Sequence, residues 1–87
     1  MRKFITQRGH IAYAISFGEI QSLGGIGVCD TCNQLQSEGY LVPVLASFLC
    51  PACFGEFEQQ ARVYPEEIPD ELRRAAYYES CIPVEGR

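Results

Sequence analysis

Two Cys-x-x-Cys pairs, Cys29-Asp30-Thr31-Cys32 and Cys50-Pro51-Ala52-Cys53, stand seventeen residues apart near the middle of this chain. This spacing is typical of four thiolates around one tetrahedral zinc ion, because each pair can bind the metal from a single tight turn. Four protein ligands leave no coordination position for water or a substrate, which is the arrangement of structural zinc sites. The sequence therefore predicts one structural Zn²⁺ with four ligands: Cys29, Cys32, Cys50 and Cys53.

Two other uses of the four cysteines remain open but are less favoured. Disulfides require an oxidising compartment, and the N-terminal stretch lacks the pattern of a secretory signal, so we expect a cytoplasmic protein. A rubredoxin-like iron site uses the same ligands, but it favours a small or left-handed residue directly after each pair. Asn33 satisfies that preference after the first pair, whereas Phe54 does not after the second. Zinc is therefore the better prediction.

The residues beside each pair predict different backbone conformations. Asn33 tolerates positive φ, which suits a zinc knuckle at the end of a strand. Pro51 suits the first turn of a helix, and the positive end of the helix dipole near Cys53 favours thiolate over thiol. We expect this helix to end at Pro65 and to have one apolar face. That face is formed by Phe54, Phe57, Ala61 and Tyr64.

Two β-hairpins are expected, one before the first pair and one between the pairs. Residues 40–49 are rich in β-forming side chains, with Pro43 on an edge strand or at a bulge. Residues 11–17 alternate large apolar with small side chains, as in a half-buried strand, and residues 4–5 are the expected partner. The glycine-rich stretch 23–27 lacks the Lys-Ser/Thr of a phosphate-binding loop, so it is expected to be a connector.

A further helix is predicted over residues 69–80, because a proline comes first, acids occupy the first turn and arginines follow. Its expected inner side consists of Ile68, Leu72, Ala75 and Ile82. The order of knuckle, hairpin and helix over residues 29–64 resembles the treble-clef zinc finger. The predicted fold class is α+β, a small zinc-stabilised treble-clef-like domain with an N-terminal β-hairpin, a central β-hairpin and two C-terminal helices.

The length of 87 residues predicts one zinc-binding domain, 1–87. Within it, residues 29–64 form the expected zinc unit and residues 65–87 form the C-terminal helix and tail. A chain of this size buries only about 60–65% of its unfolded surface, so its apolar core is thin. We therefore expect no stable fold without the metal.

Charge is distributed unevenly along the chain, whose formal net charge is −4. Residues 11–53 contain no Lys or Arg, and from residue 54 onward eight acids face four arginines. A nucleic-acid-binding surface needs the opposite sign of charge, so nucleic acid is not the expected partner. An acidic cluster next to two prolines is the predicted contact for a basic protein surface, although each acid taken singly is also explained as a solvated helix face. The cluster consists of Glu66, Glu67, Asp70 and Glu71.

The sequence offers little for catalysis, and we expect no enzymatic activity. His10 is the only histidine, and it is expected to lie exposed in a hairpin turn without a chemical role. Treble-clef nucleases of the His-Asn-His kind need histidines on the hairpin and the helix, and residues 33–64 contain none. Cys81 is the fifth cysteine, and we expect it to be a small buried apolar side chain outside the metal site.

The middle third of the chain carries a resemblance to a known group of proteins. The segments Cys29–Asn33, Gly39–Leu45 and Leu49–Phe54 look like those of small zinc proteins of phages and prophages of Gram-positive bacteria. That group includes zinc-containing anti-CRISPR inhibitors, which act on the RNA-guided nuclease of type II systems, whose basic channel holds nucleic acid. The resemblance implies a phage-encoded, non-enzymatic inhibitor that binds such a nuclease in the host cytoplasm and hinders DNA loading.

Two other functions remain open. The first is a zinc finger that binds nucleic acid through the basic residues near the N-terminus: Arg2, Lys3 and Arg8. The second is an accessory domain of a larger complex, such as a transcription assembly. The acidic balance from residue 11 onward favours a protein partner with a basic surface over both. No membrane association is expected.

Overall fold

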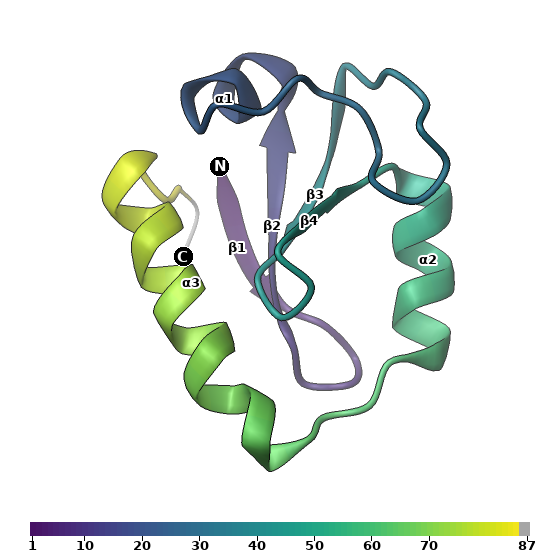
Figure 1. The fold of residues 1–87 in the computed structure, drawn as a ribbon, viewed down its shortest axis with the longest axis vertical. Coiled ribbons are helices and arrows are strands. Elements are labelled where there is room, and N and C mark those ends of the chain that lie inside the picture. Colours follow the sequence, from purple (N-terminus) through teal and green to yellow (C-terminus); the bar gives the residue numbers. More distant parts are fainter. Residues whose placement is uncertain (86–87) are drawn as a thin grey trace.

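The computed structural model describes residues 1–85 and contains a four-stranded antiparallel sheet in the order β1-β2-β3-β4 (Figure 1). The strands are β1 (Arg2–Ile5), β2 (Ile11–Ser16), β3 (Glu38–Val42) and β4 (Ser47–Leu49). Each strand pairs with the next one along the chain, so β1 and β2 form one hairpin and β3 and β4 another. Both predicted hairpins and the α+β class are therefore confirmed.

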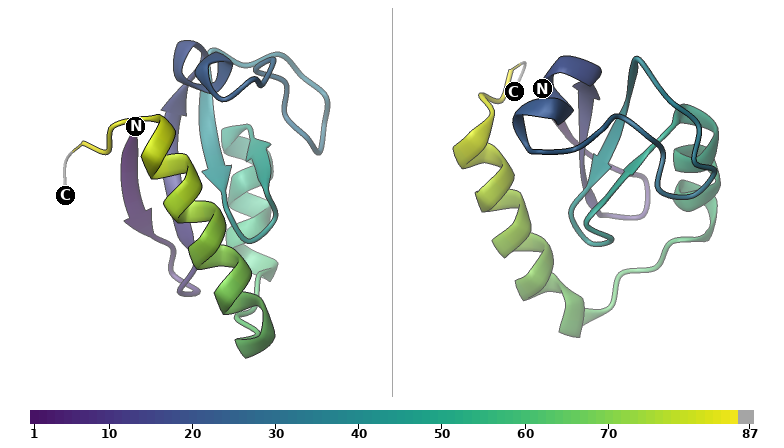
Figure 2. Two further views of the ribbon diagram at one scale, coloured as in Figure 1. Left: turned by 60° about the vertical axis from the view of Figure 1, so that its left-hand side comes forward. Right: turned by 45° about the horizontal axis from the view of Figure 1, so that its top comes forward.

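Two helices cover opposite faces of this sheet. Helix α2 (Pro51–Gln60) packs on one face, where Phe54 joins the buried side chains of Ala12 and Val42. Helix α3 (Ile68–Cys81) packs on the other face. The left view of Figure 2 shows α3 in front of the sheet and α2 behind it. The sheet is thus the middle layer of three, and its two faces have separate cores.

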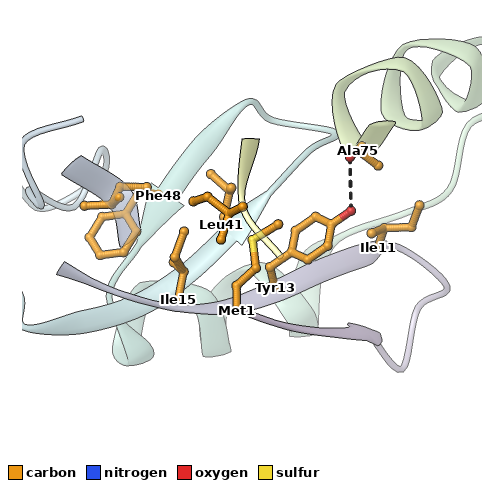
Figure 3. Close-up of a cluster of buried hydrophobic side chains, with 9 residues drawn as sticks. Met1, Ile11, Tyr13, Ile15, Leu41, Phe48 and Ala75 are labelled. Atoms are coloured by element: carbon orange, nitrogen blue, oxygen red, sulfur yellow. Dashed lines mark hydrogen bonds between the residues drawn. The ribbon is translucent and has the colours of Figure 1, made fainter. Parts of the chain in front are cut away.

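The alternation along β2 explains these two cores, because successive side chains of a strand point to opposite faces. Ile11, Tyr13 and Ile15 belong to the core on the α3 side, whereas Ala12 belongs to the core on the α2 side. Figure 3 shows Tyr13 pointing from β2 toward α3, where its hydroxyl oxygen lies 3.4 Å from the carbonyl oxygen of Ala75.

The strand that was expected to reach residue 17 ends at Ser16, because a short helix, α1 (Phe17–Ser22), begins there. Ser16 caps this helix: its hydroxyl accepts from the backbone N–H of Glu19, and the Glu19 carboxylate accepts from the backbone N–H of Ser16. This reciprocal arrangement is a capping box. The glycine-rich connector follows α1, and Gly27 has a φ of +74° and lies against the Phe17 ring.

Helix α2 begins at Pro51 as predicted but ends at Gln60, before Pro65. Its last carbonyl groups are taken by a distant side chain, since the Arg8 guanidinium donates to the carbonyl oxygens of Glu58 and Gln59. Ala61 is then extended, and Tyr64 lies outside the helix. A 3₁₀ turn, η1 (Pro65–Glu67), leads directly into α3.

Two further expectations about side-chain placement are wrong. Pro43 lies in the β3–β4 turn, fully buried, and its carbonyl oxygen accepts a hydrogen bond from Arg74 of α3. Ala75 of α3 and Ile82 directly after the helix face the core as predicted, but Ile68 and Leu72 are 39% and 55% exposed, and Glu71 takes an inner position. Glu71 therefore occupies the inner position that was predicted for Leu72, because Glu71 has polar partners beneath the helix.

Candidate metal centre

The four cysteines of the two pairs lie together beside the start of α2. The sulfur atoms of Cys29, Cys32, Cys50 and Cys53 all lie within 4.8 Å of one another. A tetrahedral zinc ion with Zn–S bonds of about 2.3 Å separates its sulfur ligands by about 3.8 Å. The Sγ atoms of Cys32 and Cys50 are 3.7 Å apart. The cluster therefore has the size and donor set of a four-coordinate metal site.

The first pair lies in a tight loop closed by backbone hydrogen bonds. The N–H of Asn33 donates to the carbonyl oxygen of Cys29 at 2.9 Å, and the N–H of Cys29 donates to Gln34 at the same distance. Asn33 has a φ of +61°, as expected of a residue that turns the chain directly after the second cysteine. An antiparallel bridge between Val28 and Leu35 closes the base of this loop. The tight turn with positive φ predicted at Asn33 is confirmed, but an isolated bridge at Val28 stands where the sequence predicted the end of a strand.

The second pair lies at the N-terminus of α2. Cys50 is the N-cap residue, and its sulfur accepts a hydrogen bond of 3.5 Å from the backbone N–H of Cys53 in the first turn. Pro51 follows the cap at a position where the missing N–H costs no hydrogen bond. The helix start therefore directs both sulfur atoms toward the loop of the first pair.

The local environment favours anionic sulfur at one position and opposes it at another. Burial raises the pKa of the Cys29 thiol, but backbone N–H groups of Cys32, Cys50 and Thr31 outweigh burial and lower it to about 6. Hydrogen bonding to the Cys50 sulfur raises the pKa of the Cys53 thiol above its ordinary value. Without a cation, the sulfur atoms share protons, because adjacent thiolates repel one another. A bound divalent ion replaces those protons and allows four thiolates to coexist.

Aromatic rings pack behind the cluster on the α2 side of the sheet. The Tyr40 and Phe54 rings are stacked with centroids 4.2 Å apart, and the Phe4 ring meets both edge-on. Cys29 and Cys50 are buried in this core, whereas Cys32 is exposed. The cysteine cluster thus joins the loop of the first pair to α2 over a small aromatic core.

The predicted partner-binding acids lie in η1 and at the start of α3. Glu66 and Glu67 are exposed, and within residues 1–85 neither carboxylate forms an ion pair. Asp70 is partly exposed and forms an ion pair of 2.7 Å with Arg73, one turn along the helix. Glu71 differs from the other three, because only 6% of it is exposed. It therefore cannot belong to a contact surface.

Glu71 is buried together with His10, and this corrects the expectation that His10 lies on the surface. His10 is 2% exposed, with its Nδ1 3.2 Å from the Glu71 carboxylate and its Nε2 2.9 Å from the carbonyl oxygen of Arg62. The backbone N–H of Ile11 donates to the same Glu71 oxygen at 2.9 Å. These contacts join β2, α3 and the segment after α2. His10 therefore has a structural role that the sequence did not indicate.

Cys81 also lies elsewhere than expected. It is exposed at the last position of α3, so it is not the buried apolar side chain that we predicted. It is not part of the cysteine cluster, as predicted.

A shallow groove lies beside the acidic residues, with a volume of about 350 Å³. Leu45 from the β3–β4 turn and Tyr64 after α2 are about half exposed at its edge, and Phe57 and His10 also line it. Glu67 lines the same groove. An apolar groove and two exposed carboxylates therefore lie next to each other on this part of the molecule.

The fold and the site define a small α+β domain with a four-cysteine cluster suited to a metal ion. No protein-family model, curated protein or solved structure matches the chain. Among the described residues, none of the helices combines the length and apolar character needed to cross a membrane.

Proposed function

We propose that this chain is a zinc-stabilised, non-catalytic protein-binding module. Four sulfur ligands at tetrahedral spacing favour Zn²⁺, a metal that structural sites hold with four cysteines. The succession of cysteine loop, hairpin and helix N-terminus supports a treble-clef-like subtype. All four coordination positions belong to the protein, so the metal stabilises the fold and performs no chemistry.

The observation that carries the proposed binding function is the acidic and apolar surface around η1. Glu66 and Glu67 are exposed there beside Tyr64, Ile68 and Leu72, which also face solvent. Exposed apolar side chains flanked by charge are typical of protein contact surfaces. The sign of the charge selects a basic partner, because complementary charge steers association and repels the wrong partners.

The proposed partner is a basic surface of a bacterial protein, in particular a type II CRISPR nuclease in the host cytoplasm. The support for that partner is the resemblance of the cysteine-containing segments and the net charge of −4. A compact acidic protein suits a basic channel that normally holds nucleic acid, and its occupancy hinders DNA loading without any reaction. In this proposal the gene is of phage origin.

The nucleic-acid alternative is weakened by the positions of the basic side chains. The Lys3 ammonium pairs with the Glu79 carboxylate at 2.8 Å, and the Arg8 guanidinium is bonded to the end of α2. Two of the three basic residues near the N-terminus are therefore engaged within the chain.

A matched pair of charge-reversal variants tests the proposal. One variant carries Glu66→Lys and Glu67→Lys, and the control carries Glu38→Lys and Glu56→Lys, two exposed acids on other elements. Both change the net charge equally, so only the first is expected to slow association with a purified type II nuclease–guide complex, by about tenfold at low salt. The difference should shrink at high salt, where screening weakens steering. Binding rates from surface plasmon resonance, with metal content measured in parallel, decide this.

Three outcomes contradict the proposal in different ways. Equal effects of both variants would indicate a non-specific charge effect. Failure of the wild-type protein to bind the nuclease at micromolar concentration would remove that partner and favour an accessory domain. Salt-sensitive binding of bare DNA or RNA that is lost on replacing Arg2, Lys3 and Arg8 would establish the nucleic-acid alternative.

A further inference from the structure

Asp30 lies directly after the first cysteine and is bonded twice to one residue of the sheet. Its backbone N–H donates to the carbonyl oxygen of Phe48 at 2.9 Å. Its carboxylate Oδ2 accepts a hydrogen bond of 2.8 Å from the backbone N–H of Phe48. Both backbone groups of Phe48 are therefore taken by Asp30.

These two bonds act at the open edge of the sheet. Phe48 lies in β4, which pairs with β3 on one side only. Its backbone groups point away from β3, and an unpaired edge of this kind needs other partners. Asp30 supplies both the donor and the acceptor that a neighbouring strand would supply.

The same bonds connect the two cysteine pairs. Asp30 is adjacent to Cys29, and Phe48 precedes Cys50 by two residues along the strand that leads into α2. In the described chain, the other backbone–backbone hydrogen bonds of residues 28–35 join residues of that loop to each other. Those backbone bonds shape the loop, and besides Asp30 its contacts with the second pair are made by the sulfur atoms: Cys29 with the backbone N–H of Cys50, and Cys32 with the Cys50 sulfur.

We propose that Asp30 is a positioning residue of the metal centre, where its carboxylate holds the first cysteine pair at the distance from the second that a tetrahedral ion requires. This inference rests on the proposed metal site. Groups that orient metal ligands typically change metal affinity by about 10- to 100-fold when they are removed. Loss of the carboxylate should therefore speed metal release.

The test compares four variants loaded with Zn²⁺ or Co²⁺. Asp30→Ala removes the acceptor, Asp30→Asn keeps an acceptor oxygen without the charge, and Asp30→Glu keeps the charge but displaces the oxygen by one methylene. Thr31→Ala is the control, because Thr31 is the exposed neighbour in the same loop. Metal release into excess chromophoric chelator gives a rate, and the Co²⁺ absorption spectrum reports the tetrahedral sulfur geometry.

We expect Asp30→Ala to release metal about tenfold faster than the wild type. The release rate of Asp30→Asn should be close to that of the wild type, and the rate of Thr31→Ala should equal that of the wild type. Asp30→Glu should release metal faster than Asp30→Asn and should broaden the Co²⁺ spectrum. If Asp30→Ala does not fold, the order of the Asn and Glu variants decides. If Asp30→Glu releases metal at the wild-type rate and Asp30→Asn releases it faster, the charge of residue 30 alone matters, and the inference is overturned.

Equal release rates for Asp30→Ala and the wild type would also overturn this inference while leaving the metal site intact. A wild-type protein that binds neither metal would overturn the metal site and this inference together. The two failures are thus distinguishable by the wild-type metal content.

Discussion

The face of the sheet that packs against α2 and the face that packs against α3 differ in how they are held. On the α2 side the buried core is small and includes two of the four cysteines. The core on the α3 side is larger and joins side chains from the sheet, α1 and α3: Met1, Ile11, Tyr13, Ile15, Ile20, Leu41, Phe48, Ala75 and Ile82.

Polar contacts add to the α3 side. Glu71 of α3 reaches His10, the Tyr13 hydroxyl donates to Glu79 at 2.6 Å, and Arg74 donates to the carbonyl oxygens of Pro43 and Val44. Within residues 1–85, no ion pair involves a residue of α2. We infer that the α2 face depends on the metal, whereas the α3 face depends on side-chain packing and buried polar pairs.

Metal removal should give the largest effect. Structural zinc contributes about 10–16 kcal/mol of apparent binding free energy at neutral pH, which matches or exceeds the net stability of a small domain. Cys50→Ser, or treatment with a strong chelator, should therefore abolish the cooperative thermal transition. Circular dichroism and elemental analysis measure both effects. As metal is removed, hydrogen exchange should show the amides of α2 and residues 28–35 losing protection first. A metal-free protein with an intact thermal transition would contradict the inference that the α2 face depends on the metal.

Acid should remove the metal reversibly. In the absence of metal, the pKa of the Cys29 thiol is lowered to about 6. The stability that this thiolate contributes is therefore fully present when the pH is above the ordinary pKa of a thiol, and it is lost as the pH falls through about 6. Bound metal delays protonation further, because protons and metal compete for the same sulfur atoms. We expect full Co²⁺ absorption at pH 7.5, with progressive loss only below pH 6 and recovery on neutralisation. Release on raising the pH would contradict this sign.

Glu71 should give the largest effect of any single residue on the α3 face. Glu71→Ala leaves the His10 ring and the Ile11 N–H without their buried hydrogen-bond partner, and each buried polar group left unsatisfied costs about 1–3 kcal/mol. Asp70→Ala is the matched control, because it breaks a partly exposed pair with Arg73 that is worth about 0–1 kcal/mol. Chemical denaturation of the metal-loaded proteins measures both. Equal losses would mean that the buried pair does not hold α3.

The sequence predicted the features that local chemistry determines. The cysteine spacing identified all four residues of the cluster, and Asn33 and Pro51 predicted the backbone beside each pair. Helix α1 was missed, although Ser16 and Glu19 have the spacing of a capping box, which was the available signal.

The remaining errors involve partners far apart in the chain. His10 and Glu71 are separated by 61 positions, so no local pattern reveals that a charged residue occupies the inner side of α3. A carboxylate is buried at low cost only when it has such a partner. Because the sequence does not reveal the partner of Glu71, the prediction placed the apolar Leu72 on the inner side. The role inferred for Asp30 likewise depends on Phe48, 18 positions away.

Cys81 should give the smallest effect and provides a control for the cysteine cluster. It is exposed at the end of α3, whereas Cys50 is buried at the start of α2, so the same Cys→Ser change is made at two contrasting sites. Cys81→Ser and Cys81→Ala should both leave the metal content unchanged and shift the free energy of unfolding by less than about 0.5 kcal/mol, as is usual for surface positions. Denaturation with parallel elemental analysis measures this. If Cys81→Ser lowers the free energy of unfolding by about 1 kcal/mol more than Cys81→Ala does, the serine hydroxyl is buried without a partner. That result would mean that the C-terminal end of α3 is packed more tightly than the structure shows.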